Sequence, residues 1–322
     1  MRHPQFEGMR SDKKAMNVHR EKPKAPELTK KAAAGPEFTH LDKIFFPKHS
    51  YTKGDLIAYY TDMADYILPY IEGRACSMNR MPDGIGGPSF YQKNNEHLPD
   101  WVPHADIFSD SNNADLHWIV GDNLNTILYM VQLGCIEINP WNSRVTRPDH
   151  PDWLVIDLDP EGVSFNRVVD VAHTVKEVCD EWKVPTHPKT SGKTGIHIYI
   201  PLGAKYTFEQ ARMFAHLIVI EVNKRQPKIT SIERNPEHRK NRIYLDWLQN
   251  REGQTLAAPY SVRPTPDASV SMPLHWDEVN KKLKPSDFTI KNTAARLKRT
   301  GDLWKPVIGK GIDLAAILKR LG

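Results

Sequence analysis

Two aspartates interrupt an apolar run at residues 153–160, WLVIDLDP. Successive side chains of a strand alternate between faces, so Asp157 and Asp159 should project from the same side, roughly 6–7 Å apart. Two like charges this close raise one pKa unless a cation neutralises them. Pro160 lacks a backbone donor and should end the strand there. The pattern indicates either a carboxylate metal site at the strand rim or a helix cap beside a solvated turn acid.

A second stretch, SGKTGIHIYIP at 191–201, combines a glycine-rich turn with polar and basic side chains. Such a turn exposes backbone N–H groups and lets a phosphate approach closely, while Lys193 and His197 would add a charge and a donor. The spacing is not that of a Walker A loop. The alternative interpretation is an ordinary hairpin turn followed by a half-buried histidine.

A third acid, Asp246, interrupts the apolar residues of RKNRIYLDWLQN in the way that Asp157 interrupts its own strand. It could instead be a structural carboxylate bonded to a neighbouring strand or tryptophan. If the three acids meet beside the glycine-rich turn, they match the needs of nucleotidyl transfer. In that chemistry, carboxylates hold two divalent ions and basic groups bind the triphosphate. Oxygen ligands favour Mg²⁺ or Mn²⁺.

Strand and helix patterns interleave along the chain without a strict βαβ repeat. We therefore expect an α+β fold with a mixed or antiparallel central sheet. Thr52 should cap a helix that begins at Lys53 and continues to about Leu68. The other expected helical segments are 122–133, 165–182, 208–225, 286–299 and 311–321.

Composition limits the functional classes. The 322 residues are 39% hydrophobic and carry a net charge of +5, a mild basic excess that suits a polyanionic partner. No apolar stretch approaches the roughly 18–20 residues that span a bilayer, so no membrane association is expected. The three cysteines lie far apart, which suits a reduced cytoplasm and indicates no zinc site. Residues 1–38 are predicted to be a flexible basic tail.

Several stretches in one order resemble the polymerase domain of bacterial DNA ligase D, a member of the archaeo-eukaryotic primase superfamily. They are LDKIFFP…TKGDLIAYY, SFYQKN, IEINPW, WLVIDLDP, TSGKTGIHIYIPL, YLDWLQN and APYSVR. The resemblance covers about 39–305, the expected catalytic domain, and leaves 306–322 as a C-terminal helical extension. It implies a primase-like fold in two modules, one of them similar to an RNA-recognition motif.

The resemblance also implies roles, position by position. Asp157, Asp159 and Asp246 match the metal-binding acids of the family. The nucleotide-binding positions are Ser191, Lys193, His197, Asn139, Arg239 and Arg263. Lys43 and Lys53 match lysines that hold the 5′-phosphate of a downstream strand, although ordinary solvated surface is the alternative. Phe90 and Tyr91 match an aromatic pair that stacks on template bases, and at least one of them should be buried because they point to opposite faces.

Two positions depart from the family pattern. Many relatives have histidine where Asn139 stands, and asparagine can hydrogen-bond but cannot carry charge. Some relatives place the turn lysine one position after Lys193, so the triphosphate contacts differ in detail.

The resemblance implies a polymerase that fills short gaps or extends ends in double-strand break repair. Its substrates would be gapped or broken duplex DNA with a 5′-phosphate and nucleoside triphosphates, often ribonucleotides, with Mn²⁺ or Mg²⁺ as cofactors. A ligase and the Ku end-binding protein would be its partners, and the cytoplasm, at the nucleoid, its location. Two alternatives are a primase that starts chains de novo and a non-catalytic module that binds nucleic-acid ends.

Overall fold

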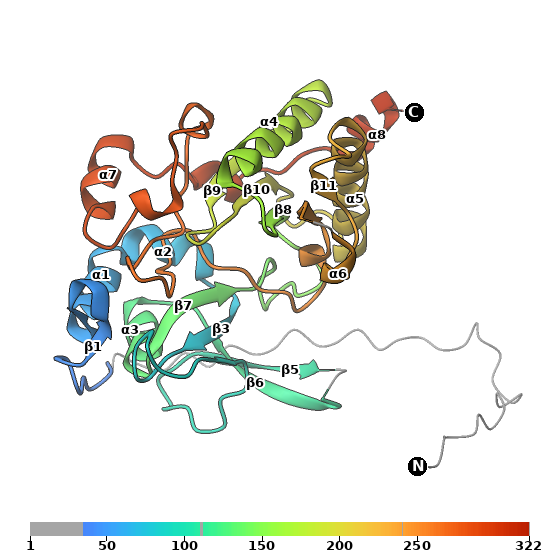
Figure 1. Cartoon of the computed structure of the whole chain (residues 1–322). Helices are drawn as coiled ribbons and strands as arrows, with labels where there is room; N and C mark the ends of the chain where they lie inside the picture. The colour runs from blue at the N-terminus through green and yellow to red at the C-terminus, as the bar shows by residue number, and fades with distance from the viewer. Residues whose placement is uncertain (1–34, 110–111, 240, 322) are drawn as a thin grey trace, which may run out of the picture.

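The computed structural model describes residues 35–109, 112–239 and 241–321. It has an α+β architecture with mostly antiparallel sheets, which confirms the predicted fold class (Figure 1). Most of the expected basic tail, residues 1–34, lies outside the described residues. The likeness of one module to an RNA-recognition motif stays a prediction.

The first sheet carries the acids found in the sequence. Its strand order is β11-β12-β8-β10-β9, and its pairs are antiparallel except for β11 with β12. The strands are β8 (Trp153–Pro160), β9 (His187–Thr190), β10 (Ile196–Pro201), β11 (Thr230–Ser231) and β12 (Ile243–Asp246). Because β8 lies at the centre, its side chains contact neighbours on both sides.

Two long helices cover one face of this sheet, α4 (Phe165–Glu181) and α5 (Phe208–Arg225) (Figure 1). Alternation along β8 places the fully buried Leu154, Ile156 and Leu158 on the face that α4 and α5 cover. A capping box in which Thr207 and Gln210 hydrogen-bond reciprocally fixes the start of α5. The odd-numbered acids of β8 therefore point to the opposite, uncovered face.

The second sheet has the order β4-β3-β6-β5, and β7 pairs with the other edge of β3. Its strands are β3 (Ala75–Arg80), β4 (Phe90–Gln92), β5 (His104–Ser109), β6 (Ala114–Val120) and β7 (Cys135–Pro140). The main apolar core joins Met78 and Ile138 of this sheet to buried residues of α1 (Lys53–Asp62), α2 (Ala64–Ile71) and α3 (Leu124–Gln132). A two-stranded ribbon, β1 (Ile44–Phe46) with β2 (Tyr51–Thr52), precedes α1.

The predicted helix start at Lys53 is confirmed, because Thr52 and Asp55 form a capping box. The expected continuation to Leu68 is wrong in one respect: the chain breaks at Met63 into α1 and α2. Pro69 lies inside α2, where it forgoes one backbone hydrogen bond.

The C-terminal region is less helical than expected over 286–299. The helix α7 covers only Thr293–Thr300, and a 3-10 turn at Pro285–Asp287 precedes it. Asn292 is the N-cap residue of α7. The expected helix over 311–321 corresponds to α8 (Leu314–Leu321).

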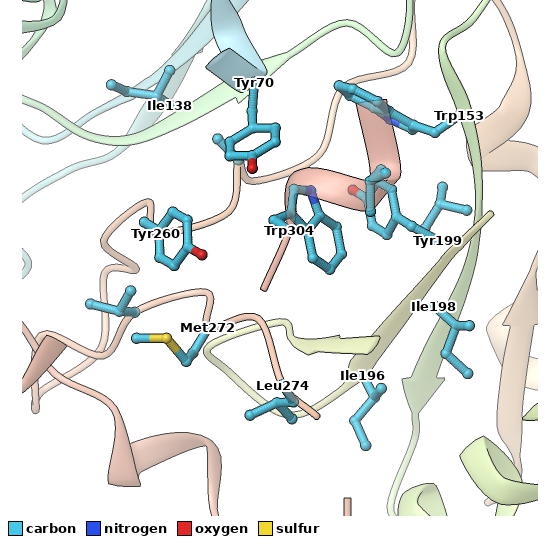
Figure 2. Packing of buried hydrophobic residues seen from close by; sticks show 14 of the residues in the cluster. Tyr70, Ile138, Trp153, Ile196, Ile198, Tyr199, Tyr260, Met272, Leu274 and Trp304 are labelled. Atoms are coloured by element: carbon cyan, nitrogen blue, oxygen red, sulfur yellow. The ribbon is translucent and has the colours of Figure 1, made fainter. Parts of the chain in front are cut away.

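Trp304 anchors the C-terminal segment in the core (Figure 2). Its ring packs edge-on against Tyr199 of β10 at 4.9 Å. The Asp302 carboxylate accepts hydrogen bonds from the hydroxyls of Tyr70 and Tyr260, both at 2.6 Å. Beyond it, buried side chains of 307–317 belong to the main core, so this part of the expected C-terminal extension packs on the domain. None of the described helices is long and apolar enough to cross a membrane.

Candidate active site

A single row of polar side chains crosses four strands of the first sheet. Asp246 of β12 is directly opposite Asp157 of β8, Asp157 is opposite His197 of β10, and His197 is opposite Lys189 of β9. Directly opposed residues of antiparallel strands share a face and lie about 4.5–5.5 Å apart at Cβ. The row therefore runs from two acids through an imidazole to an ammonium group, and Asp159 lies two positions along β8 on the same face.

The three aspartates lie together, but their carboxylates point to different partners. Asp157 Oδ1 lies 3.4 Å from His197 Nε2, and Asp159 Oδ2 lies 3.6 Å from a terminal nitrogen of Arg239. Asp246 accepts hydrogen bonds from the Leu248 N–H at 2.8 Å and from a side-chain amide at 3.1 Å. Burial, followed by repulsion from Asp246 and from Asp159, raises the pKa of Asp157 to about 8.

These contacts bear on cation binding. Within residues 35–109, 112–239 and 241–321, no three histidine, cysteine or acidic side chains are assembled as a metal-ligand group. Burial nevertheless raises the pKa of Asp246 and of Asp159, as it does that of Asp157. Three adjacent carboxylates that resist ionisation together are stabilised by a divalent cation, and their oxygen donors suit Mg²⁺ or Mn²⁺. The residues therefore fit such an ion.

Lys189 is the residue of this row that the sequence did not single out. It is fully buried, and its Nζ contacts His197 Nδ1 at 3.0 Å, the Ala257 carbonyl at 3.0 Å and Ser271 Oγ at 2.6 Å. Ser271 Oγ donates its own hydrogen to the Thr190 carbonyl. Burial and the charge of Arg263 lower the pKa of Lys189 well below its usual value, but three acceptors surround its three N–H bonds, which is the arrangement of a charged ammonium.

The ammonium defines the state of His197. Burial and the charges of Lys189 and Arg263 hold the pKa of His197 well below its usual value, so the ring is neutral. Because Nδ1 accepts from Lys189, the ring proton lies on Nε2, the nitrogen that faces Asp157. His197 therefore presents a fixed N–H donor to the acidic end of the row.

The turn at 191–195 is closed by Ser191, whose Oγ accepts from the backbone N–H groups of Lys193 at 3.2 Å and Gly195 at 3.0 Å. Gly192 has φ +77, and a Cβ there would come within 2.5 Å of Arg263 Cγ. Glycine is therefore required both for the backbone and for the close packing of Arg263. Lys193 is exposed to solvent and lines the same cavity as Ser191 and Arg263.

Asp157, Asp159, His197 and the turn face the second sheet across a cavity of about 540 Å³, whose lining includes neither Asp246 nor Lys189. The opposite wall includes Asn139 and Glu137 of β7, and the Glu137 carboxylate lies 2.9 Å from Arg263 Nε. Asn139 is buried, and its amide nitrogen donates to the Glu137 carbonyl at 3.2 Å. The cavity thus combines the acids with cationic and amide groups from both sheets.

Sequence reasoning did not identify several residues of this cavity. They are Ser77, Lys93, Glu137, Gln249, Thr255, Leu256 and Ala257. Glu137 could have been found, because it precedes Asn139 by two positions in a strand and shares its face. Lys189, which belongs to the row but not to the cavity lining, could not have been found, because only strand register shows that it reaches His197.

Arg239 lies beside the cavity rather than in its wall. Its guanidinium stacks at 4.0 Å on the ring of Tyr244 and lies 3.6 Å from Asp159 and 3.7 Å from Glu161. Of the two arginines that the sequence singled out, Arg263 contributes to the cavity wall and Arg239 only borders the acids.

Lys43 and Lys53 line a separate cavity of about 260 Å³ together with Thr39, His40 and Arg80. The alternative of ordinary solvated surface is wrong for Lys53, which is only 5% exposed and donates to the Thr39 carbonyl at 2.9 Å. Burial and the charge of Lys43 lower the pKa of Lys53. Lys43 is more exposed and pairs with Asp83 at 2.5 Å. Two crowded ammonium groups favour an anion between them.

Phe90 and Tyr91 are 45% and 60% exposed, so the expectation that one of them is buried is wrong. The physical reason is that β4 is a three-residue edge strand, which leaves both of its faces accessible. Tyr91 lines the large cavity, while the Arg80 guanidinium lies 5.2 Å from the ring of Phe90.

Comparison with known proteins adds independent findings. The model of the LigD primase-polymerase domain family matches residues 52–304. The bifunctional non-homologous end joining protein LigD of Bacillus subtilis is 35% identical over 290 residues, which are 89% of this chain and 45% of that protein. The multifunctional LigD of Pseudomonas aeruginosa is 27% identical over 98% of this chain and 39% of its own length. The chain thus spans less than half the length of these relatives.

A solved structure is also similar. The polymerase domain of Mycobacterium tuberculosis ligase D, in complex with DNA, superposes with a TM-score of 0.79 at 26% identity. The match covers 86% of this chain and 99% of that one.

Proposed function

The chain belongs to the LigD primase-polymerase domain family, and from this premise we propose that it is a DNA-directed polymerase of double-strand break repair. It extends the 3′-hydroxyl end of a gapped or broken strand by transfer of a nucleotide from a nucleoside triphosphate. The observation that carries the proposal is that Asp157, Asp159 and His197 line the large cavity, while strand register places Asp246 directly beside Asp157 and Lys189 directly beside His197.

In this proposal Asp157, Asp159 and Asp246 hold two divalent ions, Mn²⁺ or Mg²⁺. When bound, such ions lower the pKa of the attacking hydroxyl and neutralise phosphate charge. The remaining groups act on the triphosphate: Arg263 and Lys193 supply charge, and the N–H of His197 donates to a phosphate oxygen. His197 and Arg263 are buried, which strengthens the electrostatic interactions that they make.

The proposed DNA-binding residues surround this cavity. Exposed Phe90 and Tyr91 offer rings on which template bases stack without sequence preference. The cavity of Lys43 and Lys53 takes the 5′-phosphate on the far side of a gap, which would relieve the repulsion between the two lysines. A substrate with a downstream 5′-phosphate favours gap filling over de novo priming. The proposal includes a ligase and Ku as partners, which the family resemblance implies; the names of the relatives give non-homologous end joining as their process.

The test is extension of a one-nucleotide gapped duplex with ribo- and deoxyribonucleotides in Mn²⁺ or Mg²⁺. We expect metal-dependent incorporation that the Asp157→Asn and Asp246→Asn variants lose while their DNA affinity is kept. Glu161→Gln, which removes a nearby acid outside the row, serves as the matched control and keeps activity. Full activity in either aspartate variant would refute the site. Extension of an unprimed strand would favour the primase, and salt-sensitive binding without any synthesis would favour the non-catalytic module.

A further inference from the structure

A second cavity, of about 360 Å³, lies beside the large one on the second sheet. We call it the tryptophan slot. Its lining includes Ile107 of β5, Leu116 and Trp118 of β6, and Trp141, which follows β7. Trp141 continues the alternation of Glu137 and Asn139 along β7, so its side chain shares their face. The large cavity and the slot are therefore neighbouring parts of one sheet face.

The walls of the slot are aromatic and carry an unused donor. Trp118 and Trp141 pack edge to face at 5.5 Å with an interplanar angle of 76°. Trp141 is only 4% exposed, and its indole Nε1 has no hydrogen-bond partner among the described residues. Cζ2 of the same indole, two bonds from Nε1, lies 4.0 Å from the position that a Cβ on Gly253 would occupy. A buried donor without a partner is unfavourable and indicates that something accepts from it.

Lys93 connects the two cavities, because it lines both of them. Its Nζ lies 5.7 Å from the centre of the Trp118 ring, at the boundary between aromatic wall and catalytic cavity. A ligand that extends from the large cavity into the slot would therefore meet a cation first and then an aromatic surface. A nucleotide of a nucleic-acid strand can place its phosphate beside the cation and its base against the aromatic surface.

We propose that the tryptophan slot binds an unpaired nucleobase of the DNA strand that occupies the large cavity. A base satisfies each feature of the slot: it has a π face for the tryptophans, ring acceptors for Trp141 Nε1 and a phosphate for Lys93. Gln254 adds an amide for the polar base edge. An aliphatic ligand would leave the indole donor unpaired. The inference rests on the proposed function, because it takes single-stranded DNA as the ligand.

The test measures affinity rather than synthesis. Fluorescence anisotropy compares a blunt duplex with duplexes that carry single-stranded overhangs of one to four nucleotides, without nucleotide or metal. We expect the overhang to increase the affinity of the natural protein about tenfold, as stacking of one base would. Ile107→Trp, which fills the slot, removes that gain and leaves blunt-duplex affinity unchanged. Met213→Trp adds the same ring at an exposed position of α5, outside the slot, and keeps the gain.

A second variant guards against misfolding of Ile107→Trp. Phe108 is 57% exposed at the edge of the slot, so Phe108→Ala should fold and should lose part of the gain, about threefold. Photocrosslinking with 5-iodouracil in the overhang should label Trp141 or Trp118. Equal gains in the natural protein and both slot variants, or crosslinks only outside the slot, would overturn the inference. If the protein synthesises DNA but an overhang does not increase its DNA affinity, the proposed role of the slot is refuted and the proposed polymerase function stands.

Discussion

Replacing Lys189 by methionine tests whether the row across the first sheet acts as a unit. The substitution keeps the length of the side chain and removes the ammonium that contacts His197, Ser271 and the Ala257 carbonyl. Hydrogen bonds from a charged donor contribute about 1.5–3 kcal/mol each, while the buried ammonium costs several kcal/mol of desolvation. The two effects largely offset each other, so we expect the free energy of unfolding to fall by only about 1–2 kcal/mol.

The effect on catalysis should be larger than the effect on stability. Without Lys189, the His197 proton is free to move to Nδ1, and Nε2 no longer presents a fixed donor to the nucleotide. Loss of one hydrogen bond to a charged group corresponds to roughly a tenfold change. We expect the KM for the nucleotide to rise about tenfold with DNA affinity unchanged, measured by steady-state extension of a gapped duplex.

Two controls make this result specific. Ser271→Ala removes a different partner of Lys189 from the same cluster and should leave the KM for the nucleotide unchanged. The double variant Lys189→Met with His197→Gln should be no worse than His197→Gln alone, because both act through one imidazole. Additive losses in the double variant, or a normal KM in a folded Lys189→Met protein, would refute the positioning role.

Three further predictions concern other parts of the molecule. Gly192→Ala should lower the unfolding midpoint and weaken nucleotide binding. The reason is that the new Cβ meets Arg263 and the left-handed backbone costs about 1–2 kcal/mol for alanine. Calorimetry measures the unfolding midpoint, and nucleotide titration measures the binding. Lys53→Met should abolish the preference for a gap with a 5′-phosphate over one with a 5′-hydroxyl, measured by competition binding. Burial acts to raise the pKa of Glu278, but hydrogen bonds from Arg296 outweigh it, and the pKa is lowered. The stabilising contribution of Glu278 is therefore present above its unfolded pKa and is lost as pH falls through its folded pKa. The difference in free energy of unfolding between the natural protein and Glu278→Gln should shrink between pH 6 and pH 3, roughly the range around a glutamate pKa.

Each of these predictions has a matched control. Gly86 has nothing within 4 Å of a Cβ position, so Gly86→Ala should change neither stability nor nucleotide binding. Lys48 is an exposed lysine outside the small cavity, and Lys48→Met should keep the phosphate preference. A phosphate preference that survives Lys53→Met would contradict the assignment of that cavity. A pH-independent effect of Glu278→Gln would show that its ion pair contributes little.

The sequence identified the acids because an aspartate inside a buried strand contradicts the local hydrophobic pattern, and such contradictions are rare outside functional sites. Helix starts with clear side-chain caps, such as the one before Lys53, were also predictable. Lys189 was not, since HPKT is too short and polar to indicate a buried strand, and the burial of its lysine depends on acceptors more than 60 residues away. The exposure of Phe90 was missed because edge position is a property of the whole sheet.

The anchoring of Trp304 determines how the domain must be handled as a separable unit. The family match ends at this residue, yet Val307, Ile312 and Ile317 beyond it are buried in the same core. A version shortened to end at 301 would strip the carboxylate from two tyrosine hydroxyls and open a hole under Tyr199, next to the acids. In any longer polypeptide, tension applied through the C-terminal end would load the buried residues of 307–317 first, and Trp304 with its contact to Tyr199 only after them.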